Sequence, residues 1–430
     1  MQGQLFSQDF LARGILETPP FQQLDGAPFD GFCAVLRDIY QGLDASSTIN
    51  EAQTEALVIT KVLTALGWGE DFLPQVNLSG KRREDVPDVL LFASADKKAA
   101  ALPLKDDQRY RHGIALLEAK RWLRPLDRGD ITEAQDPDAP SSQMLRYLSR
   151  ADVVSDRAVK WGMLTNGCVW RLYWQDARSR SEEFFEVDVA CALGLAGMQP
   201  TLDEVAPAHA LRLFYLMFQR AAFLPQDWDG AGRSFHAYAL NEARLYEEKV
   251  SQDLGARVFG EVFPQLADAL TRWDLEAQTH QVGYGHYTRP QFTAAYLDEV
   301  REATLVLLYR LLFLFYAEDR RLLPVHDERY APYSVRRIRQ EVRDKIDSGA
   351  HFSATVPRIW LDLQGAFTLI NVGDDAIGMP AYNGGLFDRA RAPLLARVTV
   401  PDKIMAPLID ALSRRTEDLL KGWINYRDLS

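Results

Sequence analysis

The chain has 430 residues, of which 47% are hydrophobic and 25% are charged, and its formal net charge is −11. This length exceeds that of one ordinary domain, and the composition is typical of a folded globular protein rather than a disordered or fibrous one. The acidic balance argues against a general nucleic-acid coat protein, although an enzyme can still contact DNA through local basic patches. The densest patches are residues 81–83, Lys120-Arg121 with Arg124, and Arg336-Arg337 with Arg339 and Arg343, each of which is either an ordinary solvated surface or a DNA contact.

Targeting and redox signals are absent from the sequence pattern. No stretch reaches the ~18 to 20 uninterrupted apolar residues of a membrane span. The most apolar run, residues 304–317, is interrupted by Arg310 and predicts a buried helix. The N-terminus lacks the basic and apolar regions of a signal peptide, and three scattered cysteines do not form a disulfide framework or a zinc motif. We therefore expect a cytoplasmic protein that does not enter a membrane.

The first 70 residues predict two helical segments. Residues 1–45 contain Pro19-Pro20 and several glycines and predict a partly helical N-terminal cap. From Asn50, a typical helix N-cap residue, apolar side chains recur at helical spacing until Gly67 ends the helix. Three strands are predicted next, over residues 72–78, 86–92 and 114–118. The polar, alanine-rich segment 93–113 predicts a hairpin extension or an exposed loop.

The next segment completes the predicted sheet. A loop rich in Pro, Asp and Gly leads to a short helix over residues 141–149. Asn166-Gly167 joins two β-type runs, 160–165 and 168–174, and is typical of a tight primed hairpin turn. A last strand is predicted over 183–189. This order predicts an α/β domain over residues 46–200, with a central mixed sheet flanked by helices. Helical periodicity dominates residues 205–430 and predicts a mainly α-helical domain, with the boundary near residues 195–207.

Two apolar strands of this predicted sheet each carry an acid near one end. Asp88 lies in the segment VPDVLLF, and Glu118 lies in ALLEAK. A carboxylate within a buried strand is unfavourable unless it is paired or holds a metal. Glu118 and Lys120 are two residues apart, so their side chains leave the same face of the sheet. If the two strands are neighbours, Asp88, Glu118 and Lys120 converge.

The three converging residues fit phosphodiester hydrolysis. Asp88 and Glu118 are oxygen ligands suited to Mg²⁺, with Mn²⁺ as a substitute, and such an ion polarises a phosphate and activates water. Lys120 can orient that water and offset the charge that builds in the transition state. The alternative interpretation is a pair of edge strands whose acids face solvent, with Lys120 in a surface ion pair.

Three further residues complete the candidate site. Glu55 lies on the helix before the first strand, where the alternative is an ordinary solvated helix face. Gln143 and Tyr147 are four residues apart in the later helix, so their side chains share one helical face. That spacing is common in helices that have no catalytic role.

With these residues in place, the sequence resembles the PD-(D/E)XK nuclease superfamily over about residues 50–190. Pro87-Asp88 and Glu118-Ala119-Lys120 match its signature. It is similar in particular to the branch found in type I restriction subunits and recombination helicase–nucleases, matched here by Glu55, Gln143 and Tyr147. The resemblance implies that Gln143 and Tyr147 lie beside the metal site, where they contact DNA or orient the catalytic groups. It also implies that segment 93–113 is an insertion.

The helical half carries a second resemblance. Residues 313–324, 381–387 and 425–430 resemble the segment that precedes the methyltransferase in single-chain type IIG restriction–modification enzymes. There the segment is a helical connector, which implies the same for residues 205–430. Taken by themselves, Glu318-Asp319-Arg320 predicts an ion-paired helix cap, and Asn383-Gly384-Gly385 predicts a turn.

The resulting expectation is a divalent-metal-dependent endonuclease module of a restriction–modification or phage-defence system that acts on double-stranded DNA. The sequence has no glycine-rich loop or Asn-Pro-Pro-Tyr motif for S-adenosylmethionine chemistry, and no P-loop. A methyltransferase or specificity region is therefore expected beyond residue 430 or in a separate partner. Two alternatives stay open: a catalytically silent nuclease-like module that binds DNA or serves as a scaffold, and a repair exonuclease.

Overall fold

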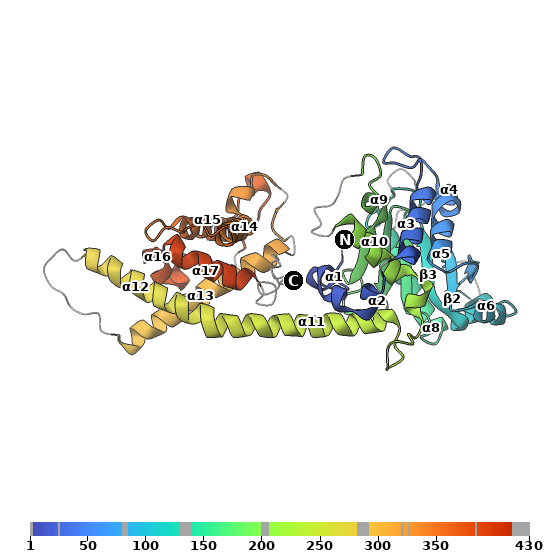
Figure 1. Cartoon of the computed structure of the whole chain (residues 1–430), viewed down its shortest axis with the longest axis horizontal. Coiled ribbons are helices and arrows are strands. Elements are labelled where there is room, and N and C mark those ends of the chain that lie inside the picture. The colour runs from blue at the N-terminus through green and yellow to red at the C-terminus, as the bar shows by residue number, and fades with distance from the viewer. Residues whose placement is uncertain are drawn as a thin grey trace. The chain divides into compact units, whose positions relative to one another are not determined.

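The computed structural model describes residues 3–24, 26–79, 85–129, 139–198, 206–281, 292–319, 322–325, 327–382 and 385–414. The chain forms two compact units, which we call the first unit (Met1–Glu247) and the second unit (Glu248–Ser430). Figure 1 labels many of their helices and two of the strands of the first unit, β2 and β3.

A six-stranded mixed sheet forms the centre of the first unit (Figure 1). Its strands follow chain order: β1 (Phe72–Pro74), β2 (Val89–Phe92), β3 (Gly113–Ala119), β4 (Trp161–Thr165), β5 (Val169–Trp174) and β6 (Phe184–Asp188). Strands β3 and β4 are parallel, and every other neighbouring pair is antiparallel. A parallel pair requires a crossover connection, and helix α8 (Pro140–Val154) supplies it. The predicted central mixed sheet is confirmed.

Helices cover both faces of this sheet. The other helices that begin before residue 230 are α1 (Gln8–Ala12), α2 (Pro19–Gln22), α3 (Ala27–Ile39), α4 (Glu51–Thr54), α5 (Thr60–Ala65), α6 (Ala95–Ala101), α7 (Asp106–Arg109), α9 (Val189–Ala192) and α10 (Pro207–Phe218). Leu117 of β3 belongs to the core that includes α3, α5 and α10, whereas Leu116 packs with Tyr147 of α8. Because side chains alternate along a strand, Glu118 lies on the α8 face with Leu116.

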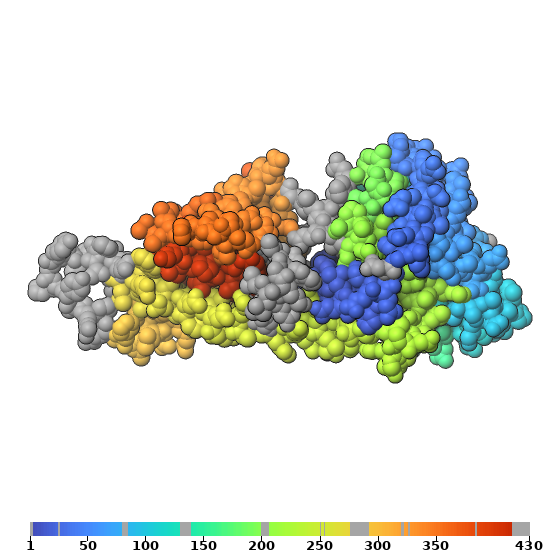
Figure 2. All heavy atoms as spheres, viewed as in Figure 1, coloured from blue at the N-terminus to red at the C-terminus, as the bar shows by residue number. Residues whose placement is uncertain are grey.

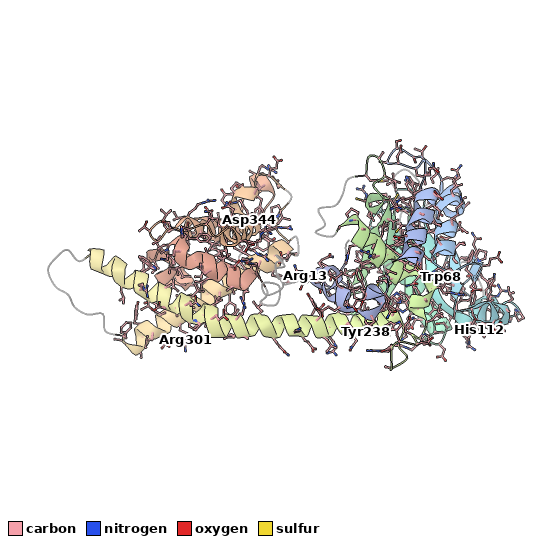
Figure 3. All side chains as sticks on the ribbon, in the orientation of Figure 1. Arg13, Trp68, His112, Tyr238, Arg301 and Asp344 are labelled. Carbon is pink, nitrogen blue, oxygen red and sulfur yellow. The ribbon has the colours of Figure 1, made fainter. Side chains whose placement is uncertain are left out.

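The helix before the sheet begins and ends where the sequence predicts. The Asn50 side chain accepts a hydrogen bond from the Gln53 backbone N–H at 2.8 Å. The Gln53 side chain accepts from the Asn50 backbone N–H at 3.0 Å, which completes a capping box. At the other end, Gly67 has φ +81°, which favours glycine. Trp68, labelled in Figure 3, then anchors the chain, because its Nε1–H donates to the Phe218 carbonyl at 3.0 Å.

Strands β1 and β2 are shorter than predicted. β1 ends at Pro74, and Gln75 follows with φ +47°, a backbone conformation that ends an extended strand. β2 begins at Val89, so Asp88 lies immediately before this strand rather than inside it. Proline cannot donate a ladder hydrogen bond, and Pro87 therefore does not extend the strand towards the N-terminus.

Segment 93–113 is not the hairpin extension or exposed loop that we expected. It contains α6, α7 and a 3-10 turn over Tyr110–His112, and α6 lies on the surface of the first unit (Figure 2). The Ser94 side chain caps α6 by accepting from the Lys97 N–H at 3.3 Å. The segment is helical because alanine and lysine favour helix over loop and Ser94 is a preferred N-cap residue.

The hairpin between β4 and β5 is confirmed, but its turn is longer than the expected primed turn. β4 ends at Thr165 and β5 begins at Val169, so residues 166–168 form the connection. The Asn166 side chain accepts from the backbone N–H groups of Cys168 (3.0 Å) and Val169 (2.8 Å). This side-chain bonding takes the place of a two-residue backbone turn.

The division between the units falls at Glu247, later than the predicted boundary near residues 195–207. Phe214 and Phe218 of α10 make edge-to-face contacts with Trp170 of the sheet, with ring centroids 5.5 and 5.8 Å away. Residues 1–45 are partly helical as predicted, and Phe10 and Leu36 join the same core. Helical periodicity therefore predicts where the helical region begins, but it does not predict that α10 packs in the core of the first unit.

The second unit is helical, as predicted. Its elements are the end of α11 (Phe235–Arg257), a π-helical turn (Val258–Val262), α12 (Phe263–Gln281), α13 (Ala294–Asp319), α14 (Val335–Asp347), α15 (Arg358–Val372), α16 (Pro393–Arg397) and α17 (Asp402–Ser413). α13 is deeply buried, which confirms the prediction for residues 304–317. Across the described ranges, no helix combines the length and apolar character that crossing a membrane requires.

Glu318 caps a different helix from the one expected. Its carboxylate accepts from the backbone N–H groups of Val335 (2.8 Å) and Arg336 (2.7 Å), so it caps the start of α14 rather than the end of α13. Asp319 is ion-paired as predicted, with Arg339 at 3.3 Å. Arg320, Asn383-Gly384 and residues 425–430 lie outside the described residues.

His236, near the start of α11, is a buried titratable group of the first unit. Its Nε2 lies 2.8 Å from the Met217 carbonyl oxygen, and its ring contacts Trp161 and Phe223 at 4.4 Å between centroids. The histidine is 0% exposed, and this burial lowers its pKa to about 4.

We predict that His236 destabilises the fold on acidification. Between pH 6.5 and 4 the unfolded chain binds a proton at this residue while the folded chain does not, so the free energy of unfolding falls as pH falls through this window. The expected loss is roughly 3 kcal/mol. Urea unfolding at pH 7 and at pH 4.5 measures it, and His236→Phe should lose that part of the pH dependence. An equal acid sensitivity in the variant contradicts the prediction.

Candidate active site

Strands β2 and β3 bring two carboxylates together. Their antiparallel register pairs Val89 with Leu117, which sets Asp88 opposite Glu118. The Ala119 N–H donates to Asp88 Oδ2 at 2.7 Å, and the Asp88 N–H donates to Glu118 Oε2 at 3.4 Å. A backbone N–H at the end of each strand therefore bonds the carboxylate of the other strand. The predicted adjacency of the two strands is confirmed.

Lys120 lies beside this pair. Its Nζ is 2.6 Å from Glu118 Oε1, and its backbone N–H donates to the Thr165 carbonyl of β4 at 2.8 Å. Glu118 is 2% exposed and Lys120 is 4% exposed, and both β2 and β3 are internal strands. The alternative of edge strands with acids in solvent and a surface ion pair is therefore wrong.

The pKa values of Asp88, Glu118 and Lys120 are all raised from their ordinary values. Burial raises the pKa of Glu118 to about 8, and the nearby Asp88 raises it as well, against the opposing effect of Lys120. Burial also raises the pKa of Asp88, against the Ala119 N–H and Lys120. Burial alone would lower the pKa of Lys120, but Glu118 outweighs it and raises that pKa. Two buried acids thus share one ammonium.

The donor set fits a divalent cation with a preference for oxygen. Asp88 and Glu118 present carboxylate oxygens, and a cation beside them would relieve their mutual repulsion. Lys120 occupies one oxygen of Glu118. Within the described ranges, no group of three or more Asp, Glu, His or Cys side chains has the arrangement of a preformed metal site. The fit to a divalent cation therefore depends on the carboxylates of Asp88 and Glu118 and on the positive charge that a cation would add beside them.

Glu55 enters the cluster from a distorted helix. Residues Glu55–Ile59 form a π-helical turn between α4 and α5, in which the Thr60 N–H donates to the Glu55 carbonyl. π-Helical turns are rare and occur frequently at functional sites. Glu55 is half-buried, and its charge contributes to raising the pKa of Asp88. The sequence pattern contained no signal for this turn.

Thr54 and Trp122 join that helix to the end of β3, and neither was predicted. The Trp122 N–H donates to Thr54 Oγ1 at 2.9 Å, and Thr54 Oγ1 donates to the Asn50 carbonyl at 2.8 Å. Gly167 packs against both, since a Cβ there would lie 2.9 Å from Thr54 Cγ2 and 3.0 Å from the Trp122 ring. A threonine in a helix is too common for its sequence to reveal this role.

Gln143 and Tyr147 lie on α8, which covers the face of the sheet that carries Glu118. Gln143 Nε2 donates to the Tyr147 hydroxyl oxygen at 2.8 Å, so the hydroxyl proton of Tyr147 can be donated elsewhere. Burial raises the pKa of Tyr147, and Glu118 raises it further, so Tyr147 lies within electrostatic range of the carboxylate pair. Gln143 reaches the site through Tyr147.

Several residues of the predicted basic patches are buried or ion-paired. Residues 81–83 lie outside the described ranges, and Lys120 and Arg124 are buried. On α14, Arg337 pairs with Glu341 and Asp362, and Arg339 is buried with Asp319. These pairings favour a structural role for the α14 patch over a DNA contact.

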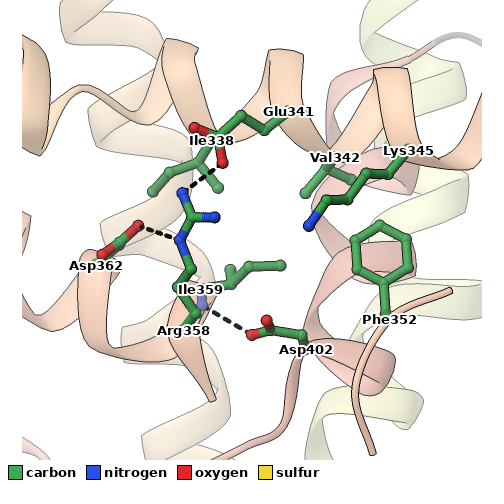
Figure 4. A pocket seen from close by; sticks show the side chains of 9 residues that line it. All are labelled: Ile338, Glu341, Val342, Lys345, Phe352, Arg358, Ile359, Asp362 and Asp402. Carbon is green, nitrogen blue, oxygen red and sulfur yellow. Dashed lines mark hydrogen bonds and ion pairs between the residues drawn. The ribbon is translucent and has the colours of Figure 1, made fainter. Parts of the chain in front are cut away.

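A pocket in the second unit is a weaker candidate (Figure 4). Three of its charged residues pair with one another, Arg358 with Glu341 at 2.7 Å and with Asp362 at 3.8 Å. Asp402 accepts from the Ile359 N–H at 2.8 Å. The space that it offers to a water-sized molecule is about 20 Å³, enough for roughly one water. It does not suit a substrate.

Comparison of the chain with protein-family models, with curated proteins and with solved structures gave no match.

Proposed function

We propose that the first unit is a divalent-metal-dependent endonuclease that hydrolyses phosphodiester bonds in double-stranded DNA. The observation that carries this proposal is the buried convergence of Asp88, Glu118 and Lys120 at the ends of two internal strands. Buried like charges destabilise a fold, and strongly perturbed carboxylates in such clusters mark candidate functional sites. The resemblance to PD-(D/E)XK nucleases points to the same chemistry.

Each side chain has a part in the proposed reaction. Asp88 and Glu118 would hold Mg²⁺ or Mn²⁺, and the bound cation supplies charge for the phosphate and lowers the pKa of water. The Lys120 ammonium donates hydrogen bonds to the attacking water or to a phosphate oxygen, where it offsets the charge that develops in the transition state. The Tyr147 hydroxyl, which Gln143 holds by a hydrogen bond, would donate a hydrogen bond to a phosphate oxygen. Glu55 adds a third carboxylate beside Asp88.

We further propose that this nuclease works within a restriction–modification or phage-defence system. In that setting, DNA modification and site recognition would come from a methyltransferase or specificity region in the same polypeptide or in a partner. The support for this setting is the resemblance of the helical half to the connector of type IIG enzymes.

Nicking of closed circular DNA tests the proposal. The full chain should relax supercoiled DNA when Mg²⁺ or Mn²⁺ is present and should stop when the ion is chelated. Degradation of linear DNA alone, with circular DNA untouched, would identify an exonuclease. Metal-independent binding without any cleavage would identify a silent DNA-binding module. Either result overturns the endonuclease.

Loss of the Tyr147 hydroxyl should slow cleavage without unfolding the chain. We expect Tyr147→Phe to lower the cleavage rate by about tenfold or more, because one hydrogen bond to the phosphate is lost in the transition state. Gln143→Ala should have a smaller effect in the same direction. Single-turnover rates and thermal unfolding measure both properties. Tyr173→Phe is the matched control, since that buried tyrosine bonds Arg171 instead. Lost stability with unchanged activity per folded molecule would assign Tyr147 to the core.

A further inference from the structure

A β-turn directly after the candidate site has a strained backbone. Residues 121–124 form this turn, in which the Arg124 N–H donates to the Arg121 carbonyl at 3.1 Å. Leu123, at the third position of the turn, has φ +59°, a conformation for which turns of this kind favour glycine. Such a backbone costs free energy at a residue with a side chain, and it persists only where surrounding contacts hold it. We call residues 121–124 the site turn, because Lys120 immediately precedes it.

Asn166, in the connection between β4 and β5, holds the site turn from the neighbouring strand. Its Nδ2 donates to the Arg124 carbonyl at 2.8 Å, in a bond that is buried. Its Oδ1 accepts from the backbone N–H groups of Cys168 and Val169, so the orientation of the amide is fixed and Nδ2 is directed at the turn. Asn166 is 5% exposed. One buried side chain therefore bonds the hairpin and the site turn at once.

The site turn influences where the Lys120 ammonium lies. The Lys120 N–H donates to the Thr165 carbonyl at 2.8 Å, which ties this residue to β4. Two residues later, within the turn, the Trp122 N–H donates to Thr54 Oγ1 at 2.9 Å. The Lys120 Nζ lies 2.6 Å from Glu118 Oε1. Because Lys120 is joined directly to the turn, a backbone rotation that relaxes the turn would also displace the ammonium.

We infer that Asn166 is a positioning residue for Lys120: its amide keeps the strained site turn closed and so fixes the ammonium beside the carboxylate pair. This inference rests on the proposed function and adds a residue to the same site. In the described part of the chain, the Asn166 side chain bonds backbone groups alone, so it acts on the site through the turn. Such an effect can be large, because displacing a reacting group by about 1 Å can lower a rate on the order of a hundredfold.

Single-turnover nicking of supercoiled DNA and Mn²⁺ affinity, measured on the same full-chain preparations, test this role. Asn166→Asp keeps an oxygen for the hairpin N–H groups and loses the donor to the Arg124 carbonyl. Asn166→Ala loses that donor without adding a charge. Both variants should cut on the order of tenfold more slowly per folded molecule. In Asn166→Ala the Mn²⁺ dissociation constant, from isothermal titration calorimetry, should stay at the wild-type value, because the amide does not bond the ligating carboxylates.

Glycine at position 123 should rescue the loss. Leu123→Gly lets the backbone adopt φ +59° without strain, so the turn depends less on the Asn166 amide. The double variant Leu123→Gly/Asn166→Ala should therefore recover most of the rate that Asn166→Ala loses, although it removes further side-chain atoms. A role of Asn166 in hairpin stability alone predicts no recovery, since Leu123 lies outside the hairpin.

Ser155→Ala is the matched control. The Ser155 hydroxyl oxygen accepts from the Val159 N–H at 3.0 Å and holds a turn before β4, at the opposite end of this strand from Asn166. In that turn Asp156 and Arg157 also have positive φ. The control should lose stability and keep the wild-type rate per folded molecule.

The outcomes separate the positioning role from the proposed reaction. Asn166 variants that cut at the rate of the control overturn the positioning role and leave the proposed hydrolysis standing. The same conclusion follows if the rate falls together with Mn²⁺ affinity in Asn166→Ala, or if Leu123→Gly does not restore the rate. A wild-type chain that binds Mn²⁺ but does not nick DNA overturns the proposed hydrolysis, and the positioning role with it.

Discussion

Asp88→Asn, Glu118→Gln and Lys120→Met should each lower divalent-dependent DNA cleavage on the order of a thousandfold. The two amide substitutions keep the shape of the side chain and remove the charge that would hold the cation. The lysine substitution removes the ammonium that lies 2.6 Å from Glu118. Asp88→Asn and Glu118→Gln should remain folded, because both changes reduce the negative charge buried in the cluster, whereas Lys120→Met removes the partner of Glu118 and should also lower stability, so its rate is compared per folded molecule. Nicking rates at saturating Mn²⁺, beside urea unfolding of the same preparations, measure both properties.

Pairs of these substitutions should be little worse than the single changes, since the three groups act on one transition state. Glu186→Gln is the control. Glu186 is also a buried acid on the α8 face of the sheet, but it pairs with Arg171 three strands away from β2. Its activity per folded molecule should match that of the wild type. Full activity in Glu118→Gln would show that the carboxylate pair is not the catalytic site.

Arg171→Met should destabilise the first unit by about 3 to 5 kcal/mol. Arg171 is 4% exposed, and its Nε donates to the buried carboxylate of Glu186. Its two other nitrogens contact Asp127 at 2.5 and 2.6 Å, which attaches the loop after β3 to the sheet. Without the guanidinium, Glu186 keeps a charge that burial makes unfavourable, and this accounts for most of the loss.

Urea unfolding of a matched set tests that account. Arg171→Met/Glu186→Leu should recover most of the stability, because the uncompensated charge is gone and apolar side chains fill the space. Asp127→Asn should cost less than about 1 kcal/mol, since the Asp127 side chain is 64% exposed and solvent screens its pair. If the double variant is as unstable as Arg171→Met, the guanidinium stabilises the sheet by packing rather than by pairing.

Local sequence signals were sufficient for most of the sheet and for the pairing of Glu118 with Lys120 on one face of it. The alternation in ALLEAK set Glu118 and Lys120 on one face, and this spacing holds in β3 whatever packs on it. Asn50 and Gly67 bounded a helix because capping depends on neighbouring residues alone. The same local physics was misjudged for residues 93–113, where alanine and lysine formed helix.

Only the tertiary structure decided which distant groups meet. Asp88 lies opposite Glu118 because of the register of β2 on β3, and local sequence does not encode this pairing of residues 30 positions apart. The π-helical turn at Glu55 is matched to the end of β3 through Thr54 and Trp122, a contact between segments 68 residues apart. α10 entered the first core because Phe214 and Phe218 fit Trp170. Helical periodicity in the sequence shows that one face of a helix is apolar. Which core buries that face depends on the side chains against which it packs.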